Sequence, residues 1–426
     1  MEEKETKKKT RKKVVEIEKD ENVREVIVEK KVGFNYAEVI VIMIITLIIG
    51  GMVGSFISFF GKEKKTTNTI IKNSVPAEMD EFLETYNGII DEYYQKVDKK
   101  ELLEAGINGM LEYLGDDYSV YMDKETTQAF NEQVDGKYKG IGVEIVTTDS
   151  GTAISRVFTD SPADKAGLKV GDIFLKVDDE DVTKKNASEL SQAIKESGKD
   201  KVNVVVKRDN KEEEFTIELK EVIIDTITTE VFEKNNKKIG YIYVSIFSAN
   251  TNDQFEKALL ELEEKGIDSL VIDVRSNSGG YLSSVTDMVS LFLNKSKVIY
   301  QLDTKGVVEQ IYSTTKESRD YPIAVLINKA SASASEILAA ALQESYGAKI
   351  VGTNSFGKGT VQRAYQLKSG ATIKYTVQKW LTPKGNWINE VGVTPDIKVE
   401  LSDDYIKNPS NDTDNQLQKA LEEVSK

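Results

Sequence analysis

One long, predominantly apolar run lies near the start of the chain, residues 39–60, and holds 22 positions without a charged side chain. A helix needs roughly 20 such residues to cross a bilayer core, so the run predicts a single transmembrane helix. A cleaved signal peptide would have a shorter apolar region and a shorter charged leader. Residues 1–38 then form a charged tail. The basic cluster at residues 7–13 favours a cytoplasmic N-terminus, with the rest of the chain extracytoplasmic at the cell membrane.

Beyond a polar linker, residues 61–75, apolar positions recur at the spacing of an α-helix. The positions that define the first helix are Met79, Phe82, Leu83, Tyr86, Ile89 and Ile90. Residues 102–114 repeat the pattern. We therefore expect an N-terminal helical segment over residues 76–130, built as a hairpin or a short bundle.

From residue 131 the pattern changes to short runs that alternate or are rich in β-branched side chains. The predicted strands are residues 141–147, 153–157, 173–177, 202–207 and 214–219. One amphipathic helix, residues 187–197, interrupts them. Together these elements predict a small β-rich domain over residues 131–221.

Strands and helices alternate in residues 222–400. The predicted strands, residues 238–244, 269–274 and 323–327, are largely apolar, and helices follow them at residues 252–265, 283–293 and 335–344. Apolar strands separated by helices are typical of a parallel sheet covered on both faces. We expect an α/β core in a multidomain chain of mixed α/β and α+β class. A polar tail, residues 401–426, follows it with a last helix at residues 415–424.

Composition restricts the chemistry. The chain has 426 residues, a net charge of −14, no His and no Cys. The lack of Cys excludes disulfides, thiol nucleophiles and zinc–thiolate sites, and the lack of His excludes a His base. A hydrolase of this composition must use Lys, Asp, Glu or Tyr as its base. The acidic balance does not indicate a nucleic-acid partner.

Three stretches of the α/β region carry residues suited to catalysis. Residues 273–282 contain paired glycines, whose N–H groups could form an oxyanion hole. Residues 329–337 place serines among alanines at a predicted helix N-terminus. Residues 352–362 place Lys358 between glycines. Each stretch alone also fits a plain turn, a helix cap or a surface loop, but together they indicate Ser/Lys catalysis.

Ser/Lys catalysis requires a neutral lysine. Free Lys has a pKa of about 10.4, so a base active near pH ~7 needs surroundings that disfavour its ammonium by roughly 4.6 kcal/mol. Burial can supply a pKa shift of this size, whereas a solvent-exposed lysine keeps its ordinary pKa. The hypothesis therefore demands a buried lysine close to a serine.

The chain resembles the C-terminal processing peptidases, or tail-specific proteases, which are Ser/Lys endopeptidases with a PDZ domain. The motifs that carry the resemblance are residues 113–122 (YLGDDYSVYM), 136–142 (GKYKGIG), 273–282 (DVRSNSGGYL), 331–337 (SASASEI), 355–362 (SFGKGTVQ) and 379–385 (KWLTPKG). The resemblance spans about residues 76–399. It implies a PDZ domain and a ClpP/crotonase-like α/β protease core, with no metal or other cofactor.

The resemblance also assigns roles to single residues. Ser333 would be the nucleophile, Lys358 the general base, and Gln362 the residue that orients the lysine amine. The oxyanion hole would be formed by backbone N–H groups of Gly279, Gly280 and Ala334.

In the PDZ domain, the resemblance implies that a loop of backbone donors holds the C-terminus of a polypeptide substrate. That loop would be Gly140, Ile141 and Gly142. Some relatives carry an Arg after the PDZ helix that couples peptide binding to activation. The matching position here is Lys195, and Lys cannot reproduce the bidentate contacts of Arg. The helical segment would serve homodimerisation, as in some relatives.

Two other functions compete with this interpretation: a penicillin-binding enzyme and a PDZ adaptor without activity. Ser355 and Lys358 match the S-x-x-K signature of penicillin-binding proteins, but the order and spacing of the companion motifs do not fit. A membrane-tethered PDZ adaptor with an inactive protease-like domain would have no need for Ser333, Lys358 and Gln362 together. We therefore expect a membrane-anchored serine endopeptidase that recognises the C-terminal tails of its substrates.

Overall fold

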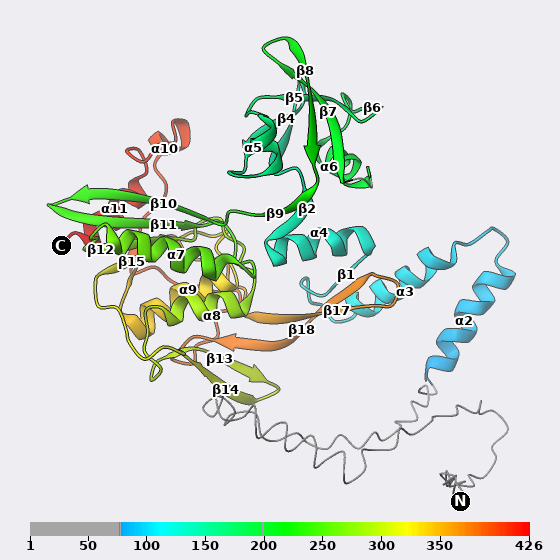
Figure 1. The fold of residues 1–426 in the computed structure, drawn as a ribbon. Coiled ribbons are helices and arrows are strands. Elements are labelled where there is room, and N and C mark those ends of the chain that lie inside the picture. The colour runs from blue at the N-terminus through cyan, green and yellow to red at the C-terminus, as the bar shows by residue number, and fades with distance from the viewer. Residues whose placement is uncertain (1–75, 77, 198–199) are drawn as a thin grey trace, which may run out of the picture. The chain divides into compact units, whose positions relative to one another are not determined.

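The computed structural model of the protein describes residues 76, 78–197 and 200–426. From Leu83 onward, the described chain forms one compact unit. It contains a helical segment, a β-rich domain and an α/β core (Figure 1). The predicted charged tail, transmembrane helix and linker lie outside the described residues. None of the helices within the described ranges combines the length and the apolarity that a membrane span requires.

The N-terminal segment contains both predicted helices and two unpredicted elements. It comprises α2 (Glu78–Glu92), α3 (Lys99–Glu112), β1 (Val120–Met122) and α4 (Lys124–Asp135). Helix α3 begins after Asp98, whose carboxylate accepts the N–H groups of Lys100 and Glu101 at 2.8 and 3.1 Å. Asp123 caps α4 in the same way, by accepting the N–H of Thr126 at 2.8 Å.

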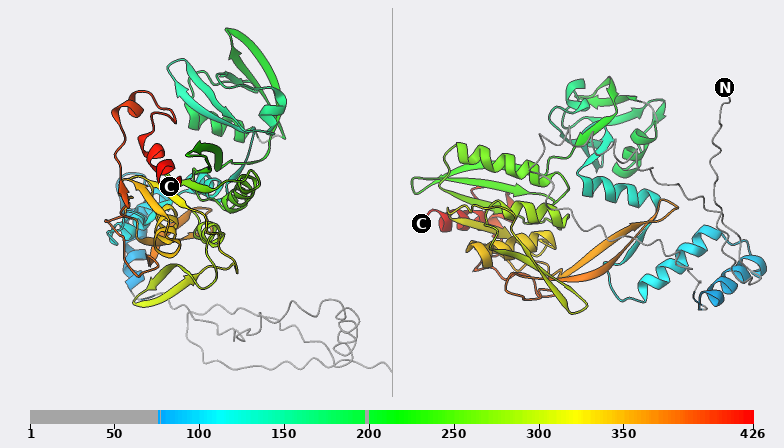
Figure 2. Two further views of the ribbon diagram at one scale, coloured as in Figure 1. Left: turned by 90° about the vertical axis from the view of Figure 1, so that its left-hand side faces the viewer. Right: turned by 60° about the horizontal axis from the view of Figure 1, so that its bottom comes forward.

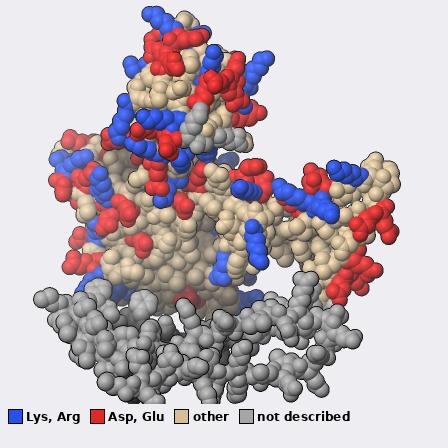
Figure 3. All heavy atoms as spheres, turned by 45° about the vertical axis from the view of Figure 1, so that its right-hand side comes forward, with Lys and Arg blue, Asp and Glu red and all other residues tan. Residues whose placement is uncertain are grey.

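The β-rich domain contains all five predicted strands and the predicted helix. Its elements are β2 (Lys137–Gly140), β3 (Val143–Thr148), β4 (Gly151–Val157), α5 (Pro162–Ala166), β5 (Ile173–Val177), β6 (Glu180–Asp181), α6 (Ala187–Glu196), β7 (Lys201–Arg208), β8 (Lys211–Glu218) and β9 (Lys220–Ile223). One sheet has the order β3-β4-β5-β7-β8, with β6 paired to β5. Its inward side chains, Phe174, Val204 and Ile217 among them, form a separate hydrophobic core with Leu190 of α6. On the face drawn in Figure 3, acidic and basic side chains are interspersed over this domain.

The chain enters and leaves the β-rich domain through neighbouring strands. β2 and β9 pair antiparallel, from Lys137 opposite Ile223 to Gly140 opposite Lys220. The β-rich domain is therefore inserted between the helical segment and the α/β core, and its first and last strands lie side by side.

The α/β core is built on a six-stranded sheet. Its elements are β10 (Ile227–Lys234), β11 (Lys237–Val244), α7 (Thr251–Glu264), β12 (Ser269–Asp273), α8 (Leu282–Ser290), β15 (Ile323–Ile327), α9 (Ala334–Ala341), η1 (Leu342–Tyr346), β16 (Lys349–Gly352) and β19 (Ile397–Lys398). The strand order is β10-β11-β12-β15-β16-β19, and every pairing from β11 to β19 is parallel. The expected α/β core is confirmed. The helix predicted at residues 335–344 continues from α9 into the π-helical turn η1.

Both faces of this sheet are covered, which explains its apolar strands. Alternate residues such as Ile272 and Val325 point to one face and pack against α7, α8 and α9. The residues between them, such as Val271 and Leu326, point to the opposite face. There they meet α11 (Asn415–Val424), which follows the short helix α10 (Asp403–Lys407).

Helix α11 has the predicted bounds but is not part of a polar tail. Its Leu417, Leu421 and Val424 are buried against the sheet. Arg275, just after β12, donates to Asp273 at 2.6 Å and to Asp414 at 2.8 Å, at the start of α11. The C-terminal helix is thus an integral layer of the core.

A second sheet extends from the core and was not predicted. It contains β13 (Val298–Thr304), β14 (Val307–Tyr312), β17 (Thr360–Gln366) and β18 (Thr372–Leu381), together with β1. Figure 2 shows β17 and β18 running out from the core as a long hairpin. Val120 of β1 pairs with Lys374 of β18. Most residues of β17 and β18 are half-buried or exposed, so their sequences lack an apolar signal.

Candidate active site

Three loops meet at one edge of the parallel sheet. They follow β12, β15 and β16, and the carboxyl ends of neighbouring parallel strands share an edge. Hydrogen bonds join the loops: the N–H of Ala332 donates to the carbonyl of Asn277 at 3.0 Å, and the N–H of Phe356 to the carbonyl of Ser331 at 2.9 Å. The three stretches selected from the sequence therefore form one site.

Ser333 stands at the N-terminus of α9 in an unusual backbone conformation. Its φ is 53° and its ψ is −114°, a region that side-chain-bearing residues rarely adopt. The neighbouring Ala332 and Ala334 are buried, whereas Ser333 itself is half-buried. The turn holds the serine at the positive end of the helix, where negative charge is stabilised.

Glu336 links the serine to the lysine, a role that the sequence did not indicate. One of its carboxylate oxygens accepts the N–H of Ser333 at 2.8 Å and the N–H of Lys358 at 2.9 Å. The other accepts the hydroxyl of Ser355 at 2.5 Å and the N–H of Gly357 at 2.7 Å. The side chain is completely buried. A single carboxylate thus fixes the loop of Ser333 against the loop of Lys358.

Lys358 is half-buried, and its pKa is lowered in the direction that the hypothesis requires, although not as far as pH ~7. Burial, with a smaller contribution from the nearby ammonium of Lys374, lowers the pKa of Lys358 to about 8. The carboxylates of Asp116 and Glu336 oppose this change by favouring the ammonium. The Lys358 Nζ lies 4.5 Å from the ring centroid of Tyr118.

The glycines beside Lys358 allow close packing. A Cβ at Gly357 would lie 2.9 Å from the backbone nitrogen of Val391, and a Cβ at Gly359 would lie 2.7 Å from the indole nitrogen of Trp387. The indole of Trp380 donates to the carbonyl of Lys358 at 2.7 Å. The lysine backbone is thereby held in place on several sides.

Gln362 lies on β17 near this lysine, but its contacts run in another direction. Its amide donates to the hydroxyls of Thr360 and Thr376 at 2.9 and 3.0 Å. Within the described residues, this amide makes no hydrogen bond to Lys358. The structure thus places Gln362 in a network with β18.

The glycine turn lies directly against Ser333. A Cβ at Gly279 would come within 2.8 Å of the Ser333 Cβ, and a Cβ at Gly280 within 2.0 Å of the carbonyl oxygen of Phe247. The N–H of Gly279 donates to the side chain of the buried Asn277 at 2.8 Å. The N–H groups of Gly280 and Ala334 have no acceptor among the described residues. Both N–H groups are therefore available to a ligand.

Ser355 is unsuited to be a nucleophile. Its buried hydroxyl donates to Glu336 and accepts the N–H of Val393 at 2.6 Å. Ser355, the serine of the S-x-x-K match, therefore has a structural role, and the basis for a penicillin-binding mechanism is lost.

The predicted peptide-binding loop, Gly140 to Gly142, joins the end of β2 to β3, and the side chain of Tyr138 lies against it. The ring of Tyr138 covers Gly140, where a Cβ would lie 2.4 Å from the ring carbon Cε2. Burial raises the pKa of Tyr138 to about 12, and hydrogen bonding from the N–H groups of Val143 and Gly142 opposes this rise. The phenol oxygen therefore lies near one N–H of the loop, that of Gly142, and near the N–H of Val143 at the start of β3.

Lys195, at the position where some relatives carry Arg, makes an ion pair outside the loop. Its Nζ lies 2.5 Å from the carboxylate of Glu132 on α4. This contact joins α6 of the β-rich domain to the helical segment.

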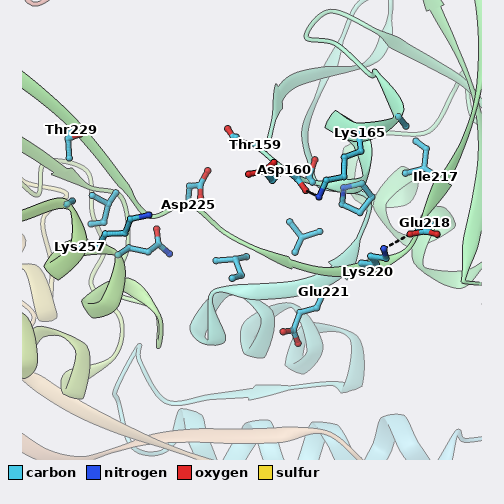
Figure 4. A pocket seen from close by; sticks show the side chains of 18 of the residues that line it. Thr159, Asp160, Lys165, Ile217, Glu218, Lys220, Glu221, Asp225, Thr229 and Lys257 are labelled. Atoms are coloured by element: carbon cyan, nitrogen blue, oxygen red, sulfur yellow. Dashed lines mark hydrogen bonds and ion pairs between the residues drawn. The ribbon is translucent and has the colours of Figure 1, made fainter. Parts of the chain in front are cut away.

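A cavity of about 970 Å³ lies elsewhere, lined by residues of α5, the β8–β9 connection, β10 and α7. Figure 4 shows Asp160, Lys165 and Glu221 around it. Its charged residues are of both signs, and Ser333 and Lys358 do not line it. It is not part of the candidate active site.

Comparison with known proteins agrees with this geometry. The model of peptidase family S41 matches residues 238–399, a PDZ domain model matches residues 154–208, and the model of the activating protease CtpB N-terminal domain matches residues 48–126. The carboxy-terminal processing protease CtpB of Bacillus subtilis (strain 168) is 40% identical over 334 residues, which are 78% of this chain and 70% of that protein. CtpA of the same organism is 34% identical over 379 residues, which are 88% of this chain and 79% of that protein.

A solved structure from Bacteroides fragilis, assigned to the S41 proteases, has a similar fold. It is 18% identical, with a TM-score of 0.51, and the match covers 78% of this chain and 91% of that one. The structural likeness supports the fold, and the identity to CtpB supports the family. The chain therefore belongs to the carboxy-terminal processing proteases of peptidase family S41, serine-type peptidases with a PDZ domain.

Proposed function

We propose that the protein is a membrane-anchored endopeptidase that cleaves polypeptides through a Ser333/Lys358 dyad. The observation that carries this proposal is the shared carboxylate of Glu336, which fixes both loops next to a lysine whose pKa is lowered to about 8. A lysine with this pKa is partly neutral near pH 8 and can accept a proton.

In the proposed reaction, the Ser333 Oγ attacks the scissile carbonyl carbon while its proton passes to the lone pair of Lys358 Nζ. The carbonyl oxygen becomes an oxyanion, which the N–H groups of Gly280 and Ala334 would receive. Collapse of this intermediate breaks the C–N bond, and Lys358 returns the proton to the leaving amine. Water then hydrolyses the acyl-enzyme by the same proton route.

Two sequence-derived roles are assigned differently within this proposal. The N–H of Gly279 is already bonded to Asn277, so Gly279 provides space for Ser333. Gln362, which donates to Thr360 and Thr376, would hold β17 against β18 and so position Lys358 only indirectly.

The PDZ domain would select substrates by their C-terminal carboxylate, with Gly140, Ile141 and Gly142 as its binding loop. Residues 39–60 would anchor the protein in the cell membrane with the catalytic part outside. The apolar side chains exposed on α2 and α3, Leu83, Ile89 and Leu103 among them, would support a homodimer.

Cleavage of an unstructured polypeptide by the full chain tests the proposal. We expect Ser333→Ala and Lys358→Arg to abolish cleavage, since Arg retains the charge but cannot lose its proton. Amidation of the substrate C-terminus should reduce cleavage without changing the scissile bond.

Two exposed residues provide matched controls. Ser150→Ala and Lys295→Arg alter a serine and a lysine that are both exposed and lie outside the three loops, and each should cleave like the wild type. Full activity of Lys358→Arg would refute the dyad, and equal cleavage of the amidated substrate would refute the role of the carboxylate.

A further inference from the structure

The aromatic ring of Tyr118 lies against the amine of the proposed base. A tyrosine ring attracts a cation placed over its face, because the π-system carries partial negative charge there. The Lys358 Nζ is at 4.5 Å from the ring centroid, well inside the range of this attraction. Burial and the carboxylates of Glu336 and Asp116 raise the pKa of Tyr118, so its phenol stays neutral at the pH where Lys358 titrates.

The turn that carries Tyr118 is fixed to the catalytic strands. Asp116 accepts the N–H of Tyr118 at 3.2 Å and the hydroxyl of Ser119 at 2.5 Å. The Ser119 hydroxyl accepts the N–H of Thr376 at 3.3 Å. Thr376 also accepts the amide of Gln362. Tyr118 is therefore held on the same strand pair that carries Gln362, immediately before β1 joins β18.

We propose that Tyr118 is a positioning residue for Lys358: its ring fixes the amine toward Ser333 and stabilises the ammonium that forms when the serine proton is transferred. This inference rests on the proposed dyad. It also means that a residue preceding the PDZ domain completes a site whose nucleophile and base both follow that domain.

Other charges around the amine remain when Tyr118 is changed. They are Lys374 on β18, Asp116 before β1, and Glu336 on α9. A Tyr118 variant therefore isolates the effect of the ring.

Steady-state cleavage by the full chain between pH 6 and 10 tests the inference. Tyr118→Phe keeps the ring, so its kcat should stay within about twofold of the wild-type value. The pH midpoint of the rising limb of its profile should stay within ~0.3 pH units of the wild type. Tyr118→Leu keeps apolar bulk without the π-face. Its kcat should fall about tenfold with KM unchanged, and the limb should move to lower pH because the ammonium is less stabilised.

Tyr113→Leu is the matched control, because Tyr113 lies on the same segment and is 90% exposed. It should behave as the wild type. Wild-type kcat in Tyr118→Leu, or an equal loss in Tyr118→Phe and Tyr118→Leu, would overturn the inference. The urea midpoint of each variant shows whether a loss of activity comes from unfolding. If Tyr118→Leu is unfolded, the activity of Tyr118→Phe decides whether the ring positions the lysine. A wild-type chain without cleavage, or an active Ser333→Ala, would refute the proposed function itself.

Discussion

At the scale of single residues, Glu336 shows how a buried charge can organise a site. Four donors surround its carboxylate, which offsets the cost of removing the charge from water. Because the donors come from two loops, the arrangement exists only when both loops are in place. The carboxylate also lies near enough to the amine of Lys358 to favour its charged form.

The electrostatics of Lys358 lead to a prediction about pH. Lys374→Met removes a positive charge that lowers the pKa of Lys358, so this pKa should rise. The neutral amine is the active form, and the rising limb of kcat/KM should therefore move to higher pH. Activity at pH 7 should fall while the plateau at high pH is retained.

A pH profile of the full chain checks this prediction. Lys368→Met, an exposed lysine in the turn between β17 and β18, is the control and should leave the limb near pH 8. An unchanged limb in Lys374→Met would contradict the electrostatic account.

Ser333 and Lys358 could be proposed from sequence because small residues, glycines and preceding apolar strands define their loops. Glu336 and Asn277 could not be assigned roles in this way. Glu336 looks like an ordinary first-turn residue, and Asn277 looks like part of a turn. Their functions depend on partners that lie on other loops, which only the folded chain brings together.

At the scale of elements, α11 is attached to the core by a buried ion pair. Arg275 contacts Asp273 and Asp414, and all three side chains are largely inaccessible to solvent. Removing one partner of such a group leaves buried carboxylates without compensation. Arg275→Met should therefore lower the free energy of unfolding by about 3–5 kcal/mol.

Urea unfolding followed by tryptophan fluorescence measures this loss, because one of the two tryptophans, Trp380, is buried in the hydrophobic core. Arg156→Met is the matched control. Arg156 pairs with Glu144 and Asp225 at a site where its side chain is 42% exposed, so the expected change is below about 1 kcal/mol. Equal losses in the two variants would disprove the special role of Arg275.

The loop after β2 gives a second prediction at this scale. The phenol of Tyr138 lies near the N–H of Gly142, which belongs to the loop proposed to bind a substrate carboxylate. Tyr138→Phe removes the competing oxygen and keeps the ring over Gly140. We expect this variant to bind a peptide with a free C-terminus several-fold more tightly than the wild type.

Fluorescence anisotropy in an inactive Ser333→Ala background checks this expectation. The amidated form of the same peptide should bind weakly to both proteins. An affinity that does not change in Tyr138→Phe would show that the phenol does not compete with the carboxylate.

At the scale of the whole molecule, the predicted order of a helical segment, a β-rich domain and an α/β core agrees with the observed elements. The apolar pattern identifies β12, β15 and α11 because each is buried on one or both faces. It misses β17 and β18, whose residues are mostly half-buried or exposed. It also misses β1, whose three residues form a strand only by pairing with β18, far along the chain. Pairing between distant segments leaves little trace in local sequence.

The pairing of β1 with β18 also orders events during synthesis. β1 leaves the ribosome first, then the whole PDZ domain, and only much later the strand that β1 needs as its partner. Until β18 has emerged and paired, the turn that carries Tyr118 has no strand to hold it. An unfinished chain that ends before β18 therefore lacks the strand that holds Tyr118 beside Lys358, and the site can be completed only near the end of synthesis.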